Sequence, residues 1–207
     1  LCDTNPHRCI EILQKRAPKY HYVRFGSFEE KQELASSGGI NVTPPEKKEG
    51  YGLLTKVHAK NLVSWAKDKP EVVVLSADLT SSTEIDTFRD TYPHRFFSMG
   101  IAEQNMLSFA GGLAREGFVP FIHTFAVFIY RRAFDQIAMS VAYPNLPVKM
   151  FGFLPGIMTP GGATHQAIED VAVMRALPNM TILETGDATD VESVLDAAMS
   201  VNGPVYV

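Results

Sequence analysis

The sequence SMGIAEQNM at residues 98–106 decides the fold, because a strand pattern changes to a helix pattern within it. Residues Arg95–Gly100 are typical of a strand that runs into a glycine turn. Beyond the turn, apolar residues recur every three or four positions, as on one buried face of a helix: Met106, Phe109, Ala110 and Leu113. Glu103 therefore lies on a first helical turn, just past the carboxyl end of a strand, where open parallel sheets bind ligands. A glutamate there also complements the helix dipole, worth about 0.3–1 kcal/mol, so its position alone does not establish a role.

Strand and helix patterns alternate in one series from about residue 54 onward. The expected strands are Val72–Leu75, Arg95–Met99, Val119–Thr124, Pro147–Phe153, Met180–Glu184 and Val205–Val207. The expected helices are Leu54–Lys67, Glu103–Gly117, Tyr130–Tyr143, a helix with Thr164 as N-cap that ends at Leu177, and Thr189–Ser200. This alternation predicts an α/β fold with a doubly wound, mostly parallel sheet and helices on both faces.

The first 50 residues differ from the rest, because Ser36–Gly39 and Pro44–Gly50 are typical of linkers. We therefore expect residues 1–50 to be an N-terminal extension or linker and residues 51–207 to be the main domain. The chain starts at Leu1 rather than at a methionine and ends inside the last expected strand. We expect the domain to be truncated at its C-terminal end.

The composition narrows the classes of function. With 207 residues, 45% of them hydrophobic, the chain can bury one substantial core. The net charge of −4 and the lack of basic clusters interleaved with aromatic residues argue against nucleic-acid binding. Only two cysteines occur, which favours a reducing, cytoplasmic environment. No apolar stretch reaches the roughly 20 residues of a membrane span, so no membrane partner is expected.

Several polar groups follow strands or form loops at what should be one edge of the sheet. They are Asp78 with Ser82, then Glu103, Thr124, and His165 in the turn Gly161–Gln166. A histidine can donate a hydrogen bond to a substrate oxygen or relay a proton. Phe125 and Phe128 are expected beside the same edge. Singly, each has a structural explanation: the histidine can tie down the glycine loop, and the phenylalanines can belong to the core.

Five sequence blocks follow one another in a fixed order: Ser76–Leu79 (SADL), Gly100–Met106 (GIAEQNM), Thr124–Phe128 (TFAVF), Arg132–Ile137 (RAFDQI) and Gly162–Gln166 (GATHQ) with Ile168–Asp170. In this order, the blocks resemble the pyrimidine-binding domain of transketolases, which has the thiamine diphosphate-binding fold. The resemblance runs from about Lys56 to Val207 and extends to the C-terminal subunit of split transketolases. The order and spacing of the five blocks make the resemblance specific, whereas a single Glu-Gln pair would be weak evidence for a family.

The resemblance implies thiamine diphosphate as cofactor, held between domains of two protomers. Glu103 matches the catalytic glutamate that hydrogen-bonds the aminopyrimidine ring. The remaining matches are cofactor contacts at Asp78, Ile101, Phe125 and Phe128, and substrate contacts at Lys56, Ser82 and His165, of which His165 is also expected to be catalytic. The implied activity is the transfer of a two-carbon ketol unit between sugars or sugar phosphates.

The family's Gly-Asp-Gly motif with a downstream Asn, which holds the diphosphate and its metal ion, is absent from this sequence. A diphosphate-binding domain or separate subunit is therefore expected to supply Mg²⁺ or Ca²⁺, and no metal site is expected in this chain. The two-sided cofactor site further implies a homodimer or heterotetramer formed through the pyrimidine domains.

Two departures from the family concern the second substrate. Where transketolases commonly carry a histidine, the sequence reads Phe153-Leu154-Pro155-Gly156; where they carry Gly-Glu-Asp-Gly, it reads Thr159-Pro160-Gly161-Gly162. Lys56 also replaces an arginine, and a lysine is a poorer bidentate phosphate ligand. These changes predict a substrate other than the usual linear sugar phosphate.

Three alternative functions stay open: a beta subunit of a 2-oxoacid dehydrogenase, a deoxyxylulose phosphate synthase-like enzyme, and a non-catalytic interaction subunit.

Overall fold

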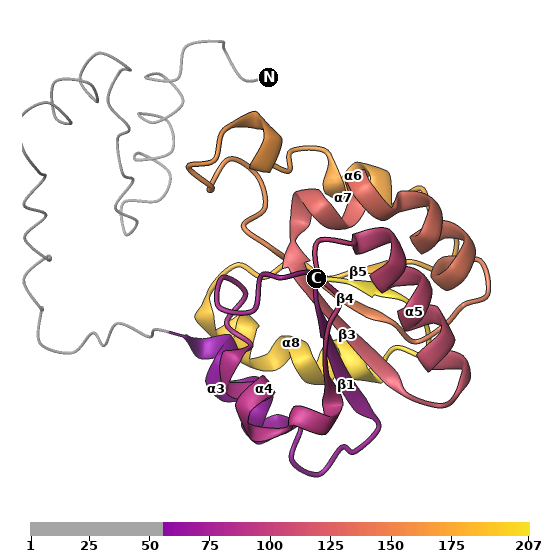
Figure 1. Ribbon diagram of the computed structural model, residues 1–207. Helices are drawn as coiled ribbons and strands as arrows, with labels where there is room; N and C mark the ends of the chain where they lie inside the picture. Colours follow the sequence, from indigo (N-terminus) through magenta and orange to yellow (C-terminus); the bar gives the residue numbers. More distant parts are fainter. Residues whose placement is uncertain (1–55) are drawn as a thin grey trace, which may run out of the picture. The chain divides into compact units, whose positions relative to one another are not determined.

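The computed structural model describes residues 56–207, which contain a six-stranded parallel sheet with the order β2-β1-β3-β4-β6-β5 (Figure 1). The strands are β1 (Val72–Ser76), β2 (Phe96–Ser98), β3 (Val119–Phe125), β4 (Lys149–Phe153), β5 (Thr181–Ile182) and β6 (Val205–Tyr206). All five neighbouring pairs are parallel. The predicted sheet is confirmed, whereas the extension expected over residues 1–50 lies outside the described residues.

Helices cover both faces of the sheet, as the doubly wound class requires. The α-helices are α3 (Val57–Trp65), α4 (Asp86–Thr91), α5 (Glu103–Arg115), α6 (Ala126–Gln136), α7 (Asp170–Met174) and α8 (Ala188–Ser200). Helices α3, α4 and α8 bury apolar side chains on one face, and α5, α6 and α7 do so on the other (Figure 1). Short turns are the 3-10 helices η1 (Pro93–Arg95) and η3 (Ala163–His165) and the π-helix η2 (Ile137–Ala142). No helix in the described part of the chain is long and apolar enough to cross a membrane.

The helix expected from Thr164 to Leu177 is wrong. Only η3 and the five-residue α7 form there, and Thr164 makes no capping bond to η3. The interruption has a tertiary cause: Ala167 pairs with Gly156 in an antiparallel bridge, with N···O distances of 2.7 and 2.9 Å. Next to the bridge, Gln166 has an extended backbone with φ of −98° and ψ of 134°, so the helix cannot continue through this segment.

Other element boundaries differ from the prediction where a strand and the following helix lie within one continuous apolar run. Helix α6 begins at Ala126, four residues before the predicted start at Tyr130, and continues into η2 up to Ala142. Residues 118–130 are almost continuously apolar, so periodicity does not separate the end of β3 from the start of α6. The short helix α4 was not predicted, although it buries Phe88.

A glycine sets the approach of α5 to η2. A Cβ atom on Gly111 would lie 2.5 Å from the backbone oxygen of Ser140, so only glycine fits at this crossing. The next residue, Gly112, is exposed and would place its Cβ with nothing within 4 Å. The two neighbouring glycines therefore differ in role, although both lie within the same helix.

Two buried histidines join α3 to the sheet. His58 of α3 and His123 of β3 are 5% and 0% exposed, and their Nε2 atoms are 2.9 Å apart. Nδ1 of His123 lies 3.3 Å from the carbonyl oxygen of Phe121, which can only accept, so this Nδ1 carries the hydrogen. The Nε2 of neutral His123 then accepts from Nε2–H of His58. Burial lowers the pKa of His58 to about 4 and also lowers that of His123, whose second cause is the neighbouring His58.

We predict that Gly111→Ala lowers the free energy of unfolding by about 1–3 kcal/mol, because the added methyl group forces α5 away from η2. Gly112→Ala is the matched control, expected to be neutral or to stabilise by up to about 1 kcal/mol through helix propensity. Urea unfolding of both variants measures the difference. Equal effects at the two positions would show that the close approach at Gly111 is not a constraint.

We also predict that the free energy of unfolding falls as the pH drops from about 6.5 toward about 4. The unfolded histidines bind protons near their ordinary pKa of about 6.5, whereas the buried pair resists protonation, so the unfolded state gains protons first. The double variant His58→Leu/His123→Leu should have a shallower pH dependence in urea unfolding between pH 4 and 6.5. His94→Gln, at an exposed position, should keep the slope of the parent chain. An unchanged slope in the double variant would contradict this interpretation.

Candidate active site

The sheet brings several predicted site residues to one edge. The strand order reverses between β1 and β3, and in doubly wound sheets the crevice at such a reversal, beyond the carboxyl ends of the strands, binds ligands. Asp78 lies just after β1, Glu103 follows β2 through a turn, and Phe125 is the last residue of β3. The turn depends on Gly100, which has φ of 69°, a conformation that favours glycine.

Glu103 is a buried carboxylate with one charged partner. It is the first residue of α5 and is only 3% exposed. Nη1 of Arg132 donates to its Oε1 over 2.7 Å, and the Arg132 side chain itself is 43% exposed. Burying a carboxylate is costly unless it is paired, so Arg132 explains how Glu103 is tolerated there. The second carboxylate oxygen has no hydrogen bond within residues 56–207 and can take a ligand donor.

Arg132 is the residue to which sequence reasoning gave no role. Its guanidinium carbon lies 3.9 Å from the centroid of the Phe128 ring, which places the cation over the aromatic face. The signal was present in the i, i+4 spacing of Phe128 and Arg132. It was missed because the helix was predicted to begin at Tyr130, so Phe128 was not placed on the same helix as Arg132.

Phe128 is the centre of an aromatic group. Its ring stacks on Phe125 with centroids 5.7 Å apart and planes at 24°, and it meets the edge of His165 at 5.4 Å. Both phenylalanines are half-buried, so part of each ring is open to a ligand. A chain of contacts through Arg132 and Phe128 therefore connects Glu103 with Phe125 and His165.

His165 belongs to η3 rather than to the first turn of a long helix. Its Nδ1 lies 2.9 Å from Oγ1 of Thr164, which leaves Nε2 without a partner among the described residues. A Cβ on Gly161 would lie 2.6 Å from Cγ of His165, so the ring occupies the space that a larger residue would need. The loop is tied to α6 by Arg131, which donates to the backbone oxygen of Ala163 over 3.2 Å and to Glu169 over 2.7 and 3.0 Å.

The other predicted site residues are exposed and make no hydrogen bond or ion pair to this group within residues 56–207. Asp78 has φ of 59°, Ile101 is 73% exposed, and Ser82 and Lys56 face solvent. Within residues 56–207, no hydrogen bond or ion pair joins any of them to Glu103 or His165. The described part also contains no group of three or more His, Cys, Asp or Glu side chains able to hold a metal ion.

One buried hydroxyl near the end of β3 also lacks a partner. Oγ1 of Thr124 is buried and makes no hydrogen bond in the described part of the chain. Buried polar atoms without partners are uncommon and point to an additional ligand or ordered water. Together with the open oxygen of Glu103 and the half-exposed aromatic rings, this donor set fits a flat heteroaromatic ring with polar edges.

The comparisons with known proteins agree with this geometry. The family model described as "Transketolase, pyrimidine binding domain" matches residues 54–207. A putative uncharacterized transketolase family protein of Sinorhizobium fredii is 44% identical over 146 residues, which are 70% of this chain and 42% of that protein. A 6-deoxy-6-sulfo-D-fructose transketolase subunit of a Clostridium species is 40% identical over 147 residues, 70% of this chain and 46% of that protein.

A solved structure gives the same result. The protein described as "Split gene transketolase, inactive beta4 tetramer" has a TM-score of 0.65 and 45% sequence identity over 73% of this chain and 49% of its own. The present chain thus spans about half the length of the relatives that it matches. With the fold, the edge residues and the family match in agreement, the chain belongs to the transketolase family, and residues 54–207 match its pyrimidine-binding domain.

Proposed function

We propose that this chain supplies the aminopyrimidine side of a thiamine diphosphate-dependent, transketolase-like transferase that moves a two-carbon ketol unit between sugars or sugar phosphates. The observation that carries the proposal is the buried carboxylate of Glu103, held at the ligand-binding edge by Arg132 and flanked by an aromatic stack. Burying a carboxylate on an exposed arginine is a costly arrangement for packing alone. The same arrangement suits a carboxylate that holds a ring nitrogen through its second oxygen.

The residues present fit the aminopyrimidine ring. Phe125 and Phe128 offer half-exposed faces for stacking, Thr124 offers an unpartnered buried hydroxyl, and Glu103 offers a free oxygen. We propose Asp78 and Ile101 as further cofactor contacts at the rim. When bound, the cofactor supplies the nucleophilic carbon of the reaction.

Each residue then has a specific task in the chemistry. Glu103 would hold the bound ring by a hydrogen bond and exchange a proton at the oxygen that has no partner within residues 56–207, while Arg132 fixes the carboxylate through the other oxygen. The phenylalanines exclude water from this bond, which strengthens it. His165, oriented by Thr164 through Nδ1, presents Nε2 to a substrate oxygen. Lys56 and Ser82 contact more distant parts of the substrate.

The diphosphate and a Mg²⁺ or Ca²⁺ ion would be held by a partner domain or subunit, because this sequence lacks the Gly-Asp-Gly motif. The chain also covers only about half of each relative. Exposed apolar side chains on α5, on η2 and just after η2 suit assembly through the pyrimidine domains into a dimer or heterotetramer; they are Phe109, Met139 and Tyr143. The low cysteine content supports a cytoplasmic location.

The second substrate is proposed to differ from a linear sugar phosphate. The stretch Phe153-Leu154-Pro155-Gly156 stands where the family commonly has a histidine, and Thr159-Pro160-Gly161-Gly162 stands where it has Gly-Glu-Asp-Gly. At Gly161 the change is more than the loss of a carboxylate, because the His165 ring fills the space in which that side chain would begin. A substrate here therefore contacts Phe153 and the His165 ring, in the places where the family offers a histidine and an acidic side chain.

We predict that Glu103→Gln lowers turnover by at least about 100-fold in the enzyme assembled with its diphosphate-binding partner. The amide keeps the shape of the side chain but cannot exchange a proton in the same way. Glu116→Gln, at the exposed end of the same helix, is the matched control and should keep the parent rate. Full activity of Glu103→Gln would reject the catalytic role and favour a non-catalytic interaction subunit.

We predict that Arg132→Met raises the concentration of thiamine diphosphate needed for half-maximal activity by about tenfold or more, because Glu103 loses its charged donor. Arg89→Met removes a fully exposed ion pair with Asp90 and should leave the cofactor requirement unchanged. Cofactor titrations of the assembled enzyme measure both effects. Equal cofactor requirements in the two variants would show that Arg132 does not position Glu103.

A further inference from the structure

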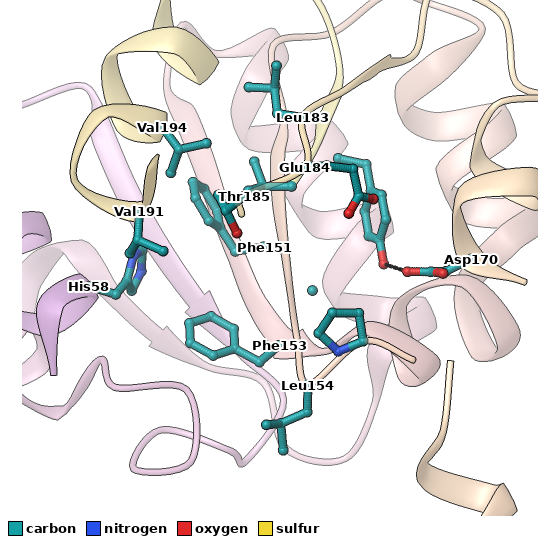
Figure 2. Close-up of a pocket in the computed structure, with 14 residues that line it drawn as sticks. His58, Phe151, Phe153, Leu154, Asp170, Leu183, Glu184, Thr185, Val191 and Val194 are labelled. Atoms are coloured by element: carbon teal, nitrogen blue, oxygen red, sulfur yellow. Dashed lines mark hydrogen bonds between the residues drawn. The ribbon is translucent and has the colours of Figure 1, made fainter. Parts of the chain in front are cut away.

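A pocket of about 210 Å³ opens where β4, β5 and β6 end beside α8 (Figure 2). Its walls are mainly apolar and include Phe151, Phe153, Leu154, Leu183, Val191 and Val194. A cavity of about 150 Å³ with such walls is large enough for benzene. The pocket can therefore hold an aromatic ring or a short aliphatic chain.

The charges around the pocket disfavour an anion. Among residues 56–207, no lysine or arginine lines the pocket, whereas Asp170 and Glu184 both do. Asp170 accepts a hydrogen bond from the Tyr206 hydroxyl over 2.7 Å, drawn in Figure 2, and Glu184 is exposed. His58 contributes an uncharged ring, because burial lowers its pKa to about 4, and its Nε2 is paired with His123. A phosphate group would meet two acids and no cation.

The pocket adjoins the aromatic stack of the proposed cofactor site. Phe153, at its wall, is the register partner of Phe125 across β4 and β3. Neighbouring strands lie about 4.8 Å apart, so these residues are next to each other on the same edge of the sheet. Phe125 in turn stacks on Phe128. The pocket and the aromatic stack thus lie on neighbouring strands at the same edge of the sheet.

We propose that this pocket receives the substituent of an uncharged aldehyde substrate, with a short aliphatic chain or an aromatic ring as the preferred group. This inference rests on the proposed function and names its substrate class. It explains three features together: the aromatic residue at position 153, the apolar walls, and the acidic rather than basic side chains at the rim.

The test uses the enzyme assembled with its diphosphate-binding partner, one ketose donor, and a series of acceptor aldehydes. From acetaldehyde to pentanal, kcat/KM should rise about fourfold for each buried methylene. Pentanal and benzaldehyde should also exceed glyceraldehyde 3-phosphate. Val191→Trp fills the pocket and should remove the dependence on chain length. Ala197→Trp, at an exposed position of the same helix outside the pocket, should preserve it.

The outcomes separate this inference from the proposed function. Ketol transfer that prefers the phosphorylated aldehyde, or that is independent of chain length, would overturn the inference and leave the transferase function intact. If no aldehyde is a substrate, the proposed function fails, and direct binding decides the ligand class of the pocket. Benzyl alcohol titrated into the full chain and followed by NMR should bind saturably, and Val191→Trp should abolish this binding. Absence of binding to the parent chain would overturn the inference.

Discussion

Parallel pairing of β1 with both β2 and β3 is the constraint on which the rest of the structure depends. Parallel neighbours need crossover connections, and right-handed crossovers in opposite directions place helices on opposite faces of the sheet. The same pairing brings the carboxyl ends of all strands to one edge. Residues that are distant in sequence, such as Glu103 and His165, therefore share one region without any local signal that links them.

Buried polar groups in this domain are tolerated through two different arrangements. His58 and His123 pair as neutral rings, so their burial requires no counter-ion and joins α3 to the sheet. Glu103 is paired with a partly exposed arginine through one oxygen, and its other oxygen has no hydrogen bond to the part of the chain that the structure describes. In the first arrangement, each ring is hydrogen-bonded to another group within residues 56–207. The second leaves unused hydrogen-bonding capacity beside Thr124 and the phenylalanines, as expected of a group that contacts a ligand.

The sequence predicted more of the sheet than of the loops. The run Val72–Leu75 is β-branched and bounded by turn residues, so β1 was placed within one residue. The loop that carries His165 was predicted as helix because its local pattern is helical, but the bridge between Gly156 and Ala167 overrides that pattern. The start of α6 lies within an apolar run, so the sequence pattern did not locate it. The contact of Arg132 with Phe128 was not predicted for the same reason. Periodicity describes one element at a time and cannot report such long-range contacts.

The sequence by itself determined the fold class, the family resemblance and the candidates Glu103, Phe125, Phe128 and His165, because periodicity and ordered motifs are local properties of the chain. Only the tertiary structure decided which candidates lie together. It gave Glu103 its arginine, paired the two histidines, and formed the pocket at the ends of β4, β5 and β6. These depend on distances between residues that are far apart in sequence. The stretch at residues 98–106 thus determined the position of the Glu103 carboxylate at the start of α5. The packing of α6 against α5 determined its hydrogen-bond partner, Arg132.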